Sequence, residues 1–365
     1  MKKLHSETSA GLTAARRPIM KDVAKLAGVS RTTVSLVLSG RSDARIPEST
    51  RRRVAKAARA LNFRPSVAAQ QLRTRRSRMV GLIGDEIASG PFAGGLIAGA
   101  QAAVSDRDHA LVVLNTGREG DLSIDLDAFD DRDVDALIFA TVMTRLVKVP
   151  DAARQREVIL LNCFDTHRSA RCVLPDDRRG GSAATALAAQ HGHRRIALIG
   201  GERGTWPAAQ RLAGYKEALA SWSIAYDRAL VRYGNWHADS GYEEALKVLD
   251  LKKAPTALLC GNDRMALGAY DAVKERGLRI PEDVSVIGYD DQEEIVRYAR
   301  PPLTTIRIPY FEMGEAAAVA VLEGGGPKCQ MLSCEPVLRR SLGSLRSGSD
   351  EEDDFSNCSD RMLSQ

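Results

Sequence analysis

The residues with the clearest chemistry lie near the N-terminus, in the segment DVAKLAGVSRTTVSLVLSG over residues 22–40. Apolar residues at helical spacing, Gly28 and Ser30 predict two short helices joined by a tight turn, with Ser30 capping the second helix. Small helical pairs of this kind also serve purely structural roles. As a helix-turn-helix, however, the second helix presents its N-terminal residues to base edges in the DNA major groove. Arg31 and Thr32 are then the expected base readers, because Arg31 can donate two hydrogen bonds to guanine.

Hydroxyl and cationic side chains beside these readers suit the DNA backbone. Thr33 and Ser35 lie on the same predicted helix, and Arg51 and Arg52 lie in a third helical pattern that begins near Pro47. Hydroxyl and guanidinium groups are common donors to phosphate oxygens, and such contacts position a protein without reading sequence. We therefore expect Thr33, Ser35, Arg51 and Arg52 to contact phosphates.

A second group of polar side chains follows short aliphatic runs further along the chain. They are Asp85, Asn115, Asn162, Asn262, Asp263 and Asp290. In open α/β sheets, ligands bind beyond the carboxyl ends of the strands. Converging carboxylates and amides bind hydroxyl groups, and with an aromatic side chain they suit a neutral polyol such as a sugar. Each residue is also a candidate helix cap or loop residue, Asp263 above all, because a predicted helix follows it.

Catalytic and metal-binding patterns are missing from the sequence. It contains no G-x-S-x-G motif, and GGERG over residues 200–204 departs from G-x-G-x-x-G. His191 and His193 lie two residues apart with no third ligand in view, and none of the six cysteines forms a C-x-x-C pair. We therefore expect no enzymatic activity, no cofactor and no metal.

Charge is distributed unevenly over the 365 residues. The net charge is +5, yet residues 16–78 carry +14 and residues 1–15 carry +1, which leaves −10 for the rest. A basic head before an acidic body indicates a polyanion partner, most simply nucleic acid.

The longest uncharged run, residues 87–105, contains a proline and four glycines, and the N-terminus has no apolar signal region. We therefore expect no membrane association and a cytoplasmic protein.

The remaining pattern shows which elements must position these groups. Three helical patterns, near residues 20–27, 31–38 and 47–61, share apolar residues that predict a small all-α head. A polar, basic bridge follows. Seven short aliphatic runs then alternate with helical stretches, starting at residues 80, 110, 136, 158, 195, 256 and 284. Continuous apolar strands alternating with helices are typical of parallel, doubly wound α/β sheets, and the length predicts two lobes.

These strings resemble the head and hinge of the LacI/GalR transcriptional repressors, through DVAKLAGVS, TTVS and RIPESTRRRVAKAARALNFRPSVAAQQLR. The likeness continues through GHRRIALIGG (192–201), RLAGYKEAL (211–219), the segment 255–291 and PPLTTIRIPYFEMGEAA (301–317). It covers roughly residues 19–341. It implies a sequence-specific DNA-binding repressor whose operator affinity is switched by a small effector, most simply a sugar. It also implies a palindromic operator and a homodimer, associated with the nucleoid when bound to DNA.

The resemblance also implies a domain plan, with a hinge helix and a periplasmic-binding-protein-like body of two doubly wound α/β lobes. Three segments are expected to cross between the lobes, near residues 174–176, 303–306 and 323–325. The expected domains are a disordered arm (1–17), the helix-turn-helix domain (18–64), the hinge (65–78), the effector-binding and dimerisation domain (79–341) and a disordered acidic tail (342–365). Within the body, the N-lobe is expected at 79–174 plus 306–323 and the C-lobe at 175–305 plus 324–341.

Residue roles follow from the same likeness. Leu72, in AQQLR, would be the hinge leucine that wedges into the minor groove, where apolar side chains unstack and kink the duplex. Trp236 falls where an aromatic often stacks on a sugar, and Phe92 would close the N-lobe side. Asn162, one of the polar residues that follow predicted strands, is added to the expected effector contacts. The complete set of expected effector contacts is Phe92, Asn162, Arg211, Trp236, Asn262 and Asp290.

The chain departs from the family pattern at several positions. Leu36 stands where an arginine is usual, and a leucine can touch a thymine methyl but cannot donate to guanine. Ile19 replaces the usual threonine cap of the first helix, a loss of about 0.5–2 kcal/mol unless another group caps it. Asp176 and Asp177 fall where the family has an Asp-Asn step, and we expect helix capping from at least one of them.

Two alternatives to a regulator stay open from the sequence. One is a sugar-binding protein whose DNA-binding head is no longer functional, and the other is an α/β enzyme fused to such a head. The complete helix-turn-helix segment, Leu72 and the charge of +14 favour the regulator over the first. The second would require a catalytic constellation that the sequence does not contain.

Overall fold

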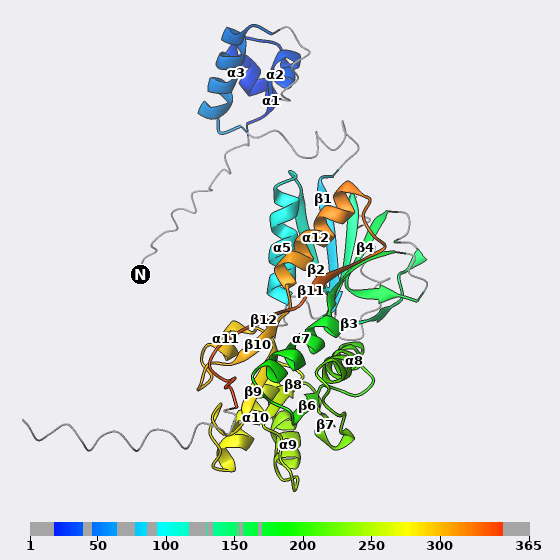
Figure 1. The fold of residues 1–365 in the computed structure, drawn as a ribbon. Helices are drawn as coiled ribbons and strands as arrows, with labels where there is room; N and C mark the ends of the chain where they lie inside the picture. Colours follow the sequence, from blue (N-terminus) through cyan, green and yellow to red (C-terminus); the bar gives the residue numbers. More distant parts are fainter. Residues whose placement is uncertain are drawn as a thin grey trace, which may run out of the picture. The chain divides into compact units, whose positions relative to one another are not determined.

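The computed structural model describes residues 18–38, 46–63, 77–85, 93–116, 129, 134–151, 153, 156–166 and 170–345. The chain divides into two compact units, residues 1–77 and 78–365, which we call the head and the body (Figure 1). Leu72, Phe92, the expected arm and most of the expected hinge and tail lie outside the described residues. Among the described helices, none has the length and apolar character needed to cross a membrane.

The head contains the three predicted helices, α1 (Met20–Ala27), α2 (Arg31–Leu38) and α3 (Glu48–Ala60). Gly28 ends α1 in the left-handed conformation, with φ of 63°, so a turn of two residues suffices before α2 begins. The predicted small core is confirmed, with buried side chains from all three helices: Val23, Ala24, Ala27, Val34, Val54, Ala57 and Ala58. This core fixes the angle at which α2 is presented to solvent.

Both helices of the motif have polar caps. The N–H of Thr33 donates to the hydroxyl of Ser30 at 3.0 Å, which confirms the predicted cap of α2. At α1, the backbone N–H of Ile19 donates to the Asp22 carboxylate at 2.8 Å. Asp22 therefore supplies half of a capping box and offsets the missing threonine.

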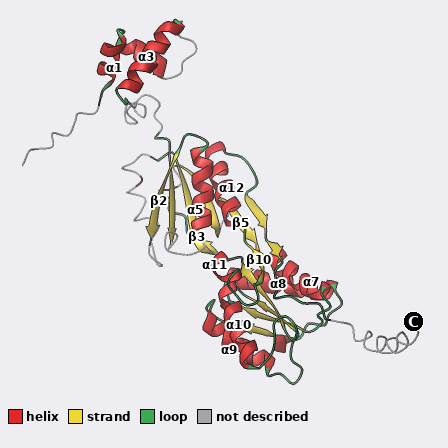
Figure 2. Ribbon diagram, turned by 90° about the vertical axis from the view of Figure 1, so that its left-hand side faces the viewer, coloured by secondary structure: helices red, strands yellow, loops and turns green. Residues whose placement is uncertain are grey.

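The body is built on two six-stranded sheets (Figure 2). The N-lobe sheet has the order β11-β5-β4-β3-β1-β2 and is parallel throughout. Its strands are β1 (Met79–Asp85), β2 (Ala110–Thr116), β3 (Ala136–Val147), β4 (Glu157–Asp165), β5 (Arg171–Asp176) and β11 (Cys329–Ser333). The helices α5 (Ala93–Ser105) and α12 (Tyr310–Glu323) lie side by side against it (Figure 1).

The C-lobe sheet has the order β12-β10-β9-β8-β6-β7, with only β12 antiparallel to its neighbour. Its strands are β6 (Ile196–Gly200), β7 (Val231–Tyr233), β8 (Ala257–Cys260), β9 (Ser285–Asp290), β10 (Thr304–Arg307) and β12 (Glu335–Val337). Its helices are α7 (Asp177–Gln190), α8 (Trp206–Ser221), α9 (Ala238–Leu249), α10 (Asp263–Glu275) and the short α11 (Glu293–Val296) and η2 (Arg228–Leu230). The predicted doubly wound α/β class is confirmed in both lobes.

Three segments cross between the lobes. The first joins β5 to α7 at Asp176 and Asp177, close to the expected position. The second, residues 308–309, joins β10 to α12 a few residues later than expected. The third lies at Cys334, between β11 and β12.

The prediction that residues 324–333 belong to the C-lobe is wrong. Three consecutive glycines, Gly324 to Gly326, have positive φ values of 71°, 74° and 86°. They reverse the chain after α12, so that β11 returns along the N-lobe sheet and pairs with β5. The sequence CQMLS gives little signal for this strand, because it lies at the sheet edge and is only partly buried.

The helices α5 and α12 approach each other closely through two glycines. A Cβ atom on Gly99 would lie 1.9 Å from the Phe311 carbonyl oxygen, and one on Gly314 would lie 2.1 Å from the Leu96 carbonyl oxygen. Any side chain at either position would force the helices apart. This contact fixes α12, whose first residue, Tyr310, faces the space between the lobes.

His193 forms a hydrogen bond that holds the segment after β12, at Gly343, against the C-lobe. Its Nε2 donates to the Gly343 carbonyl at 3.0 Å, because a carbonyl can only accept, and its Nδ1 accepts from the Thr256 hydroxyl at 2.9 Å. The side chain is 2% exposed, and burial lowers its pKa below the ordinary value of 6.5 against a smaller opposing effect of the Gly343 hydrogen bond.

We predict that the stability contributed by the two His193 hydrogen bonds decreases in acid. The lowered pKa means that the unfolded chain binds the proton more readily, so the contribution is present above about pH 6.5 and is lost as the pH falls through the folded pKa. The excess stability of wild type over His193→Gln, measured by urea unfolding, should shrink between pH 7.5 and pH 5.5. A difference that does not change with pH would contradict the assignment of a neutral His193.

Candidate functional site

Four of the predicted DNA-contacting residues lie on the side of α2 away from its buried residue Val34. Arg31 and Thr32 are exposed at the start of the helix, while Ser35 and Leu36 are partly buried one turn further on. These four positions share one side of α2, because residues four apart meet on a helix. The surface therefore offers a guanidinium, two hydroxyls and one apolar contact.

Thr33 and Arg51 already make contacts within the head. The Thr33 hydroxyl lies 2.9 Å from the Ser30 hydroxyl, and the Arg51 Nε donates to the Ile46 carbonyl at 3.4 Å. Both side chains are partly buried. Each keeps further donor capacity, since a hydroxyl can rotate and a guanidinium has five N–H groups.

A cavity of about 450 Å³ lies between the two lobes of the body. The N-lobe contributes residues of β3 and β4, the C-lobe contributes the loops after its strands, and the crossing segments contribute Pro175 and Ile308. All five predicted effector residues that the structure describes line it: Asn162, Arg211, Trp236, Asn262 and Asp290. The carboxyl ends of the strands thus converge on one polar cleft.

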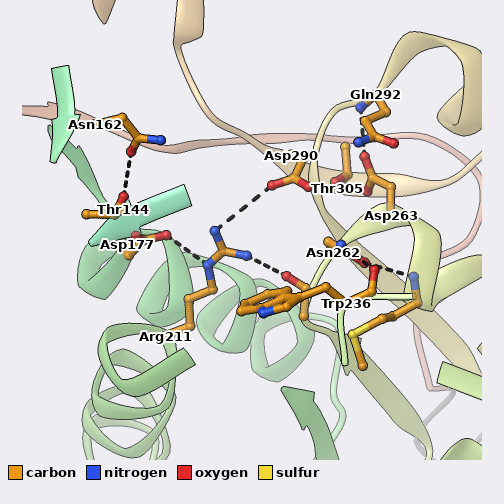
Figure 3. Close-up of polar contacts among 12 residues, drawn as sticks. Thr144, Asn162, Asp177, Arg211, Trp236, Asn262, Asp263, Asp290, Gln292 and Thr305 are labelled. Atoms are coloured by element: carbon orange, nitrogen blue, oxygen red, sulfur yellow. Dashed lines mark hydrogen bonds and ion pairs between the residues drawn. The ribbon is translucent and has the colours of Figure 1, made fainter. Parts of the chain in front are cut away.

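Arg211 occupies the centre of the cleft floor (Figure 3). Its Nε donates to the Asp177 carboxylate at 2.8 Å, its Nη1 donates to the Gly261 carbonyl, and its guanidinium lies 3.5 Å from the centre of the Tyr289 ring. The side chain is 7% exposed. Burial opposes its charge, but Asp177, Tyr289 and Asp290 outweigh burial and raise its pKa. Arg211 is therefore a fixed cation with three partners.

Asp290 completes the charged part of the site. Its Oδ1 lies 4.0 Å from the Nη2 of Arg211, which is too long for a hydrogen bond. Burial raises the pKa of Asp290 well above the ordinary range, and Arg211 opposes that shift. A donor and an acceptor at this separation can both be satisfied by one hydroxyl group placed between them.

Trp236 lies in the loop between β7 and α9 and forms one wall of the cleft. Its indole packs on Gly201, where a Cβ atom would lie 2.2 Å from the ring. Its backbone carbonyl accepts from the Asn262 Nδ2 at 3.0 Å, and its indole Nε1 is buried with no hydrogen-bond partner among the described residues. The glycine and the Asn262 amide hold the indole in place.

Asn162 is almost wholly engaged by the N-lobe. Its Oδ1 accepts from the Thr144 hydroxyl, and its Nδ2 donates to the Thr141 and Val142 carbonyls at 2.9 and 3.1 Å. These bonds span the irregularity between Ala140 and Arg145, where the β3–β4 register shifts. Asn162 thus shapes the N-lobe wall more than it offers free hydrogen-bonding groups.

Four residues around the cleft have positive φ values although none is a glycine. The values are 58° for Asn162, 70° for Trp236, 110° for Asp290 and 62° for Asp291. Backbone of this kind costs about 1–3 kcal/mol per residue and concentrates at functional sites. The surrounding hydrogen bonds must therefore hold these residues in position.

Two of the six strand-end residues lie away from the cavity lining. Asp263 is fully buried and accepts from the Gln292 backbone N–H at 2.7 Å and the Thr305 hydroxyl at 2.6 Å. It supports the loop that follows Asp290, which is the structural alternative left open for it. Asn115 is exposed on the edge strand β2. The side chain of Asp85 lies outside the described residues.

Sequence reasoning missed several residues of the site, among them Asp177 and Tyr310. Asp176 caps α7 by accepting from the Arg179 N–H at 3.0 Å, as expected, but Asp177 is 1% exposed and pairs with Arg211. Tyr310 enters the cavity from the second crossing. Neither residue could be assigned to the site from the sequence. Asp177 has the same side chain as Asp176, which caps the helix, and Tyr310 does not follow a predicted strand.

A helix-turn-helix head joined to a two-lobed α/β body with a polar cleft defines a ligand-responsive transcription factor. Residues 19–66 match the family described as "Bacterial regulatory proteins, lacI family", and residues 185–342 match "Periplasmic binding protein-like domain". The chain is 32% identical over 333 residues to the ribose operon repressor of Haemophilus influenzae, covering 90% of this chain and 99% of that protein. The chain belongs to the lacI family and is a DNA-binding transcriptional repressor with an effector-binding body.

Solved structures agree with this assignment. The lac repressor dimer bound to operator and the anti-inducer ONPF is 27% identical with a TM-score of 0.71, covering 90% of this chain and 100% of that chain. The complex of the transcriptional regulator CelR with cellobiose is 29% identical with a TM-score of 0.61, covering 89% and 100%. The predicted family and the predicted fold are both confirmed.

Proposed function

We propose that the protein binds a palindromic operator as a homodimer, and that a sugar in the interlobe cleft switches its operator affinity. The observation that carries the effector class is the pair Arg211 and Asp290, 4.0 Å apart beside the indole of Trp236. The names of two similar proteins, a ribose operon repressor and a regulator complexed with cellobiose, support the same class. DNA binding implies a protein of the cytoplasm, associated with the nucleoid when bound.

The proposed sugar contacts follow from the donor and acceptor sets. One sugar hydroxyl accepts from the Arg211 Nη2 and donates to the Asp290 carboxylate. The Asn262 amide, whose Oδ1 already caps α10 through the Met265 N–H at 2.8 Å, keeps one N–H for a second hydroxyl. The indole face of Trp236 covers the apolar face of the ring, and Phe92 closes the N-lobe side.

The proposed switch uses the three crossings that link the lobes within the described residues. A ligand that contacts Asn162 in one lobe and Asp290 in the other favours one lobe arrangement over another, and its differential affinity sets the size of the shift. In the homodimer, that rearrangement changes the spacing of the two hinges. Arg31, Thr32 and Leu36 then read base edges in each half-site, while Thr33, Ser35, Arg51 and Arg52 hold phosphates.

Selection from random DNA duplexes at fixed salt, with and without a panel of pentoses, hexoses and disaccharides, tests this function. We expect one palindromic site whose affinity changes with one sugar, and the sugar recovered unchanged by NMR. Salt-sensitive binding without sequence preference would instead favour a sugar-binding protein with a non-functional head. Conversion of the sugar would overturn the proposal that the body has no enzymatic activity.

We predict that Asp290→Asn removes the effector response and keeps operator affinity without effector. The neutral amide oxygen accepts from a hydroxyl more weakly than a carboxylate does, so sugar affinity should fall at least 10-fold by calorimetry. Because the pKa of Asp290 is raised, wild-type affinity should also fall on acidification, whereas that of the variant should not. Asp271→Asn, on the exposed side of α10, is the matched control. A normal response from Asp290→Asn would remove Asp290 from the site.

We predict that Leu72→Ala weakens binding to the selected operator and leaves sugar affinity unchanged. An alanine is too short to unstack a base step, so the variant should lose affinity for the operator but not for random DNA. Leu338→Ala, at a body leucine that is 61% exposed, is the control. Equal operator affinity for wild type and Leu72→Ala, by fluorescence anisotropy, would show that Leu72 is not the wedge.

A further inference from the structure

The outer side of α3 has three cations, two of which, Lys56 and Arg59, have no role in the proposed operator contacts. Arg52, Lys56 and Arg59 are spaced four and three residues apart, so they project from one side of the helix. The buried residues of α3, Val54, Ala57 and Ala58, lie on the other side. All three cations are exposed, and the side chain of Arg52 is 80% exposed.

These cations border an open groove of about 900 Å³, which we call the α3 groove. It is lined by Val37, Glu48, Arg51, Arg52, Ala55, Lys56, Arg59 and Ala60. Four of these residues are cationic and one is acidic, and the two alanines leave room between the long side chains. Glu48 pairs with Arg52 at 3.2 Å, but both side chains are largely exposed, so the pair is weak.

The α3 groove is separate from the base-reading side of α2. Neither Arg31 nor Thr32 lines it, and α2 contributes only Val37. Val37 is six residues beyond Arg31, which at about 3.6 residues per turn places the two on different sides of α2. The groove is nevertheless continuous with Arg51, one of the proposed phosphate contacts.

Two of these cations, Lys56 and Arg59, have no acidic partner among the described residues. The Nε of Arg59 contacts only the Ala55 carbonyl of its own helix, at 3.4 Å. Like charges at this spacing destabilise an isolated helix. A polyanion in the α3 groove would remove that repulsion.

We propose that the α3 groove binds DNA phosphates beyond those reached from α2. Arg52 to Arg59 span about 10 Å along the helix axis, and one DNA strand carries a charge about every 3.4 Å of duplex axis, so the three cations cover a stretch that holds several phosphates. These phosphates are those of the DNA that flanks the operator on the same duplex, because the groove is continuous with Arg51, and a second duplex is the alternative that the test must exclude. This inference rests on the head binding DNA, but it requires no particular operator and no effector.

The test compares Arg52→Gln/Lys56→Gln/Arg59→Gln with a control that removes three exposed body cations, Lys252→Gln/Lys253→Gln/Lys328→Gln. Binding is measured by anisotropy between 50 and 200 mM salt on three duplexes: the operator alone, the operator with long flanks, and an unrelated sequence. Each lost phosphate contact lowers the slope of log K against log salt by about 0.9, so we expect a slope about 2–3 smaller per head. The ratio of the affinity for the flanked operator to the affinity for unrelated DNA should stay unchanged.

The arms of the experiment separate the two sources of phosphate. A loss seen only with flanked or unrelated DNA supports the flanking DNA as the occupant, whereas capture of a labelled second duplex by immobilised operator complexes, lost in the triple variant, would overturn that assignment. Arg52→Lys/Arg59→Lys should keep the wild-type slope, and melting curves check folding. Slopes equal to those of the control on every duplex, with no difference in capture, would overturn the inference. If wild type shows no operator preference, the unrelated duplex still tests the groove.

Discussion

Arg211→Met is expected to abolish effector binding and to lower the free energy of unfolding by about 3–5 kcal/mol. The substitution keeps the volume of the side chain but leaves Asp177 and Asp290 buried without their cation. It also removes the donor to the Gly261 carbonyl and the guanidinium that lies against Tyr289. Urea unfolding and sugar calorimetry measure the two effects separately.

A double substitution distinguishes loss of charge from loss of packing. Asp177→Asn/Arg211→Met replaces the buried pair by neutral groups, so it should recover a large part of the stability while effector binding stays absent. Equal destabilisation by the single and double variants would show that packing, not the unpaired carboxylate, carries the cost. Full sugar affinity in Arg211→Met would remove Arg211 from the effector site.

Arg31→Ala is expected to weaken binding to the selected operator by about 1–3 kcal/mol per half-site, or about 5-fold to 150-fold. Arg31 is exposed at the first position of α2, where a guanidinium can donate to both acceptors of a guanine. Affinity for unrelated DNA should fall far less, because a single charge contributes little to non-specific binding. Repeating the DNA selection with the variant should show relaxed preference at one base pair in each half-site.

Lys25→Ala serves as the comparison for Arg31→Ala. Lys25 is an exposed cation of α1 outside the proposed readers, so its loss should alter all sequences alike and leave the selected site unchanged. An unchanged preference in Arg31→Ala would mean that another residue reads the operator. Leu36 would then be the next position to vary, because it lies one turn further along the same side of α2.

The head was predictable from the sequence because its signals are local. Gly28 and Ser30 mark the turn, and apolar spacing gives all three helices. The body was predictable where strands are buried and continuous, as in β1, β4 and β9. The short edge strands β7, β11 and β12 were not predictable, because they hold three to five residues and bury little apolar surface. The place of β11 depends on a glycine turn, which only the three-dimensional packing defines.

The cleft was predictable in part for a similar reason. Parallel strands end at the same edge of a sheet, so polar residues that follow buried strands lie close together. This brings Asn162, Asn262 and Asp290 to one cavity. The partner of Arg211 was not predictable, because Asp177 is 34 residues away and its neighbour Asp176 has the same side chain but caps α7. Asp263 follows the structural alternative left open for it, since this strand-end aspartate supports a loop.

The most direct test measures whether occupancy of the cleft changes DNA binding. The sugar found by selection is titrated into wild-type and Asp290→Asn complexes with the operator at fixed salt, and operator affinity is followed by anisotropy. We predict a change of about 5-fold to 150-fold for wild type and none for the variant. Calorimetry showing that the sugar binds the wild-type body without changing operator affinity, or an equal change in both proteins, would contradict a repressor switched through this cleft.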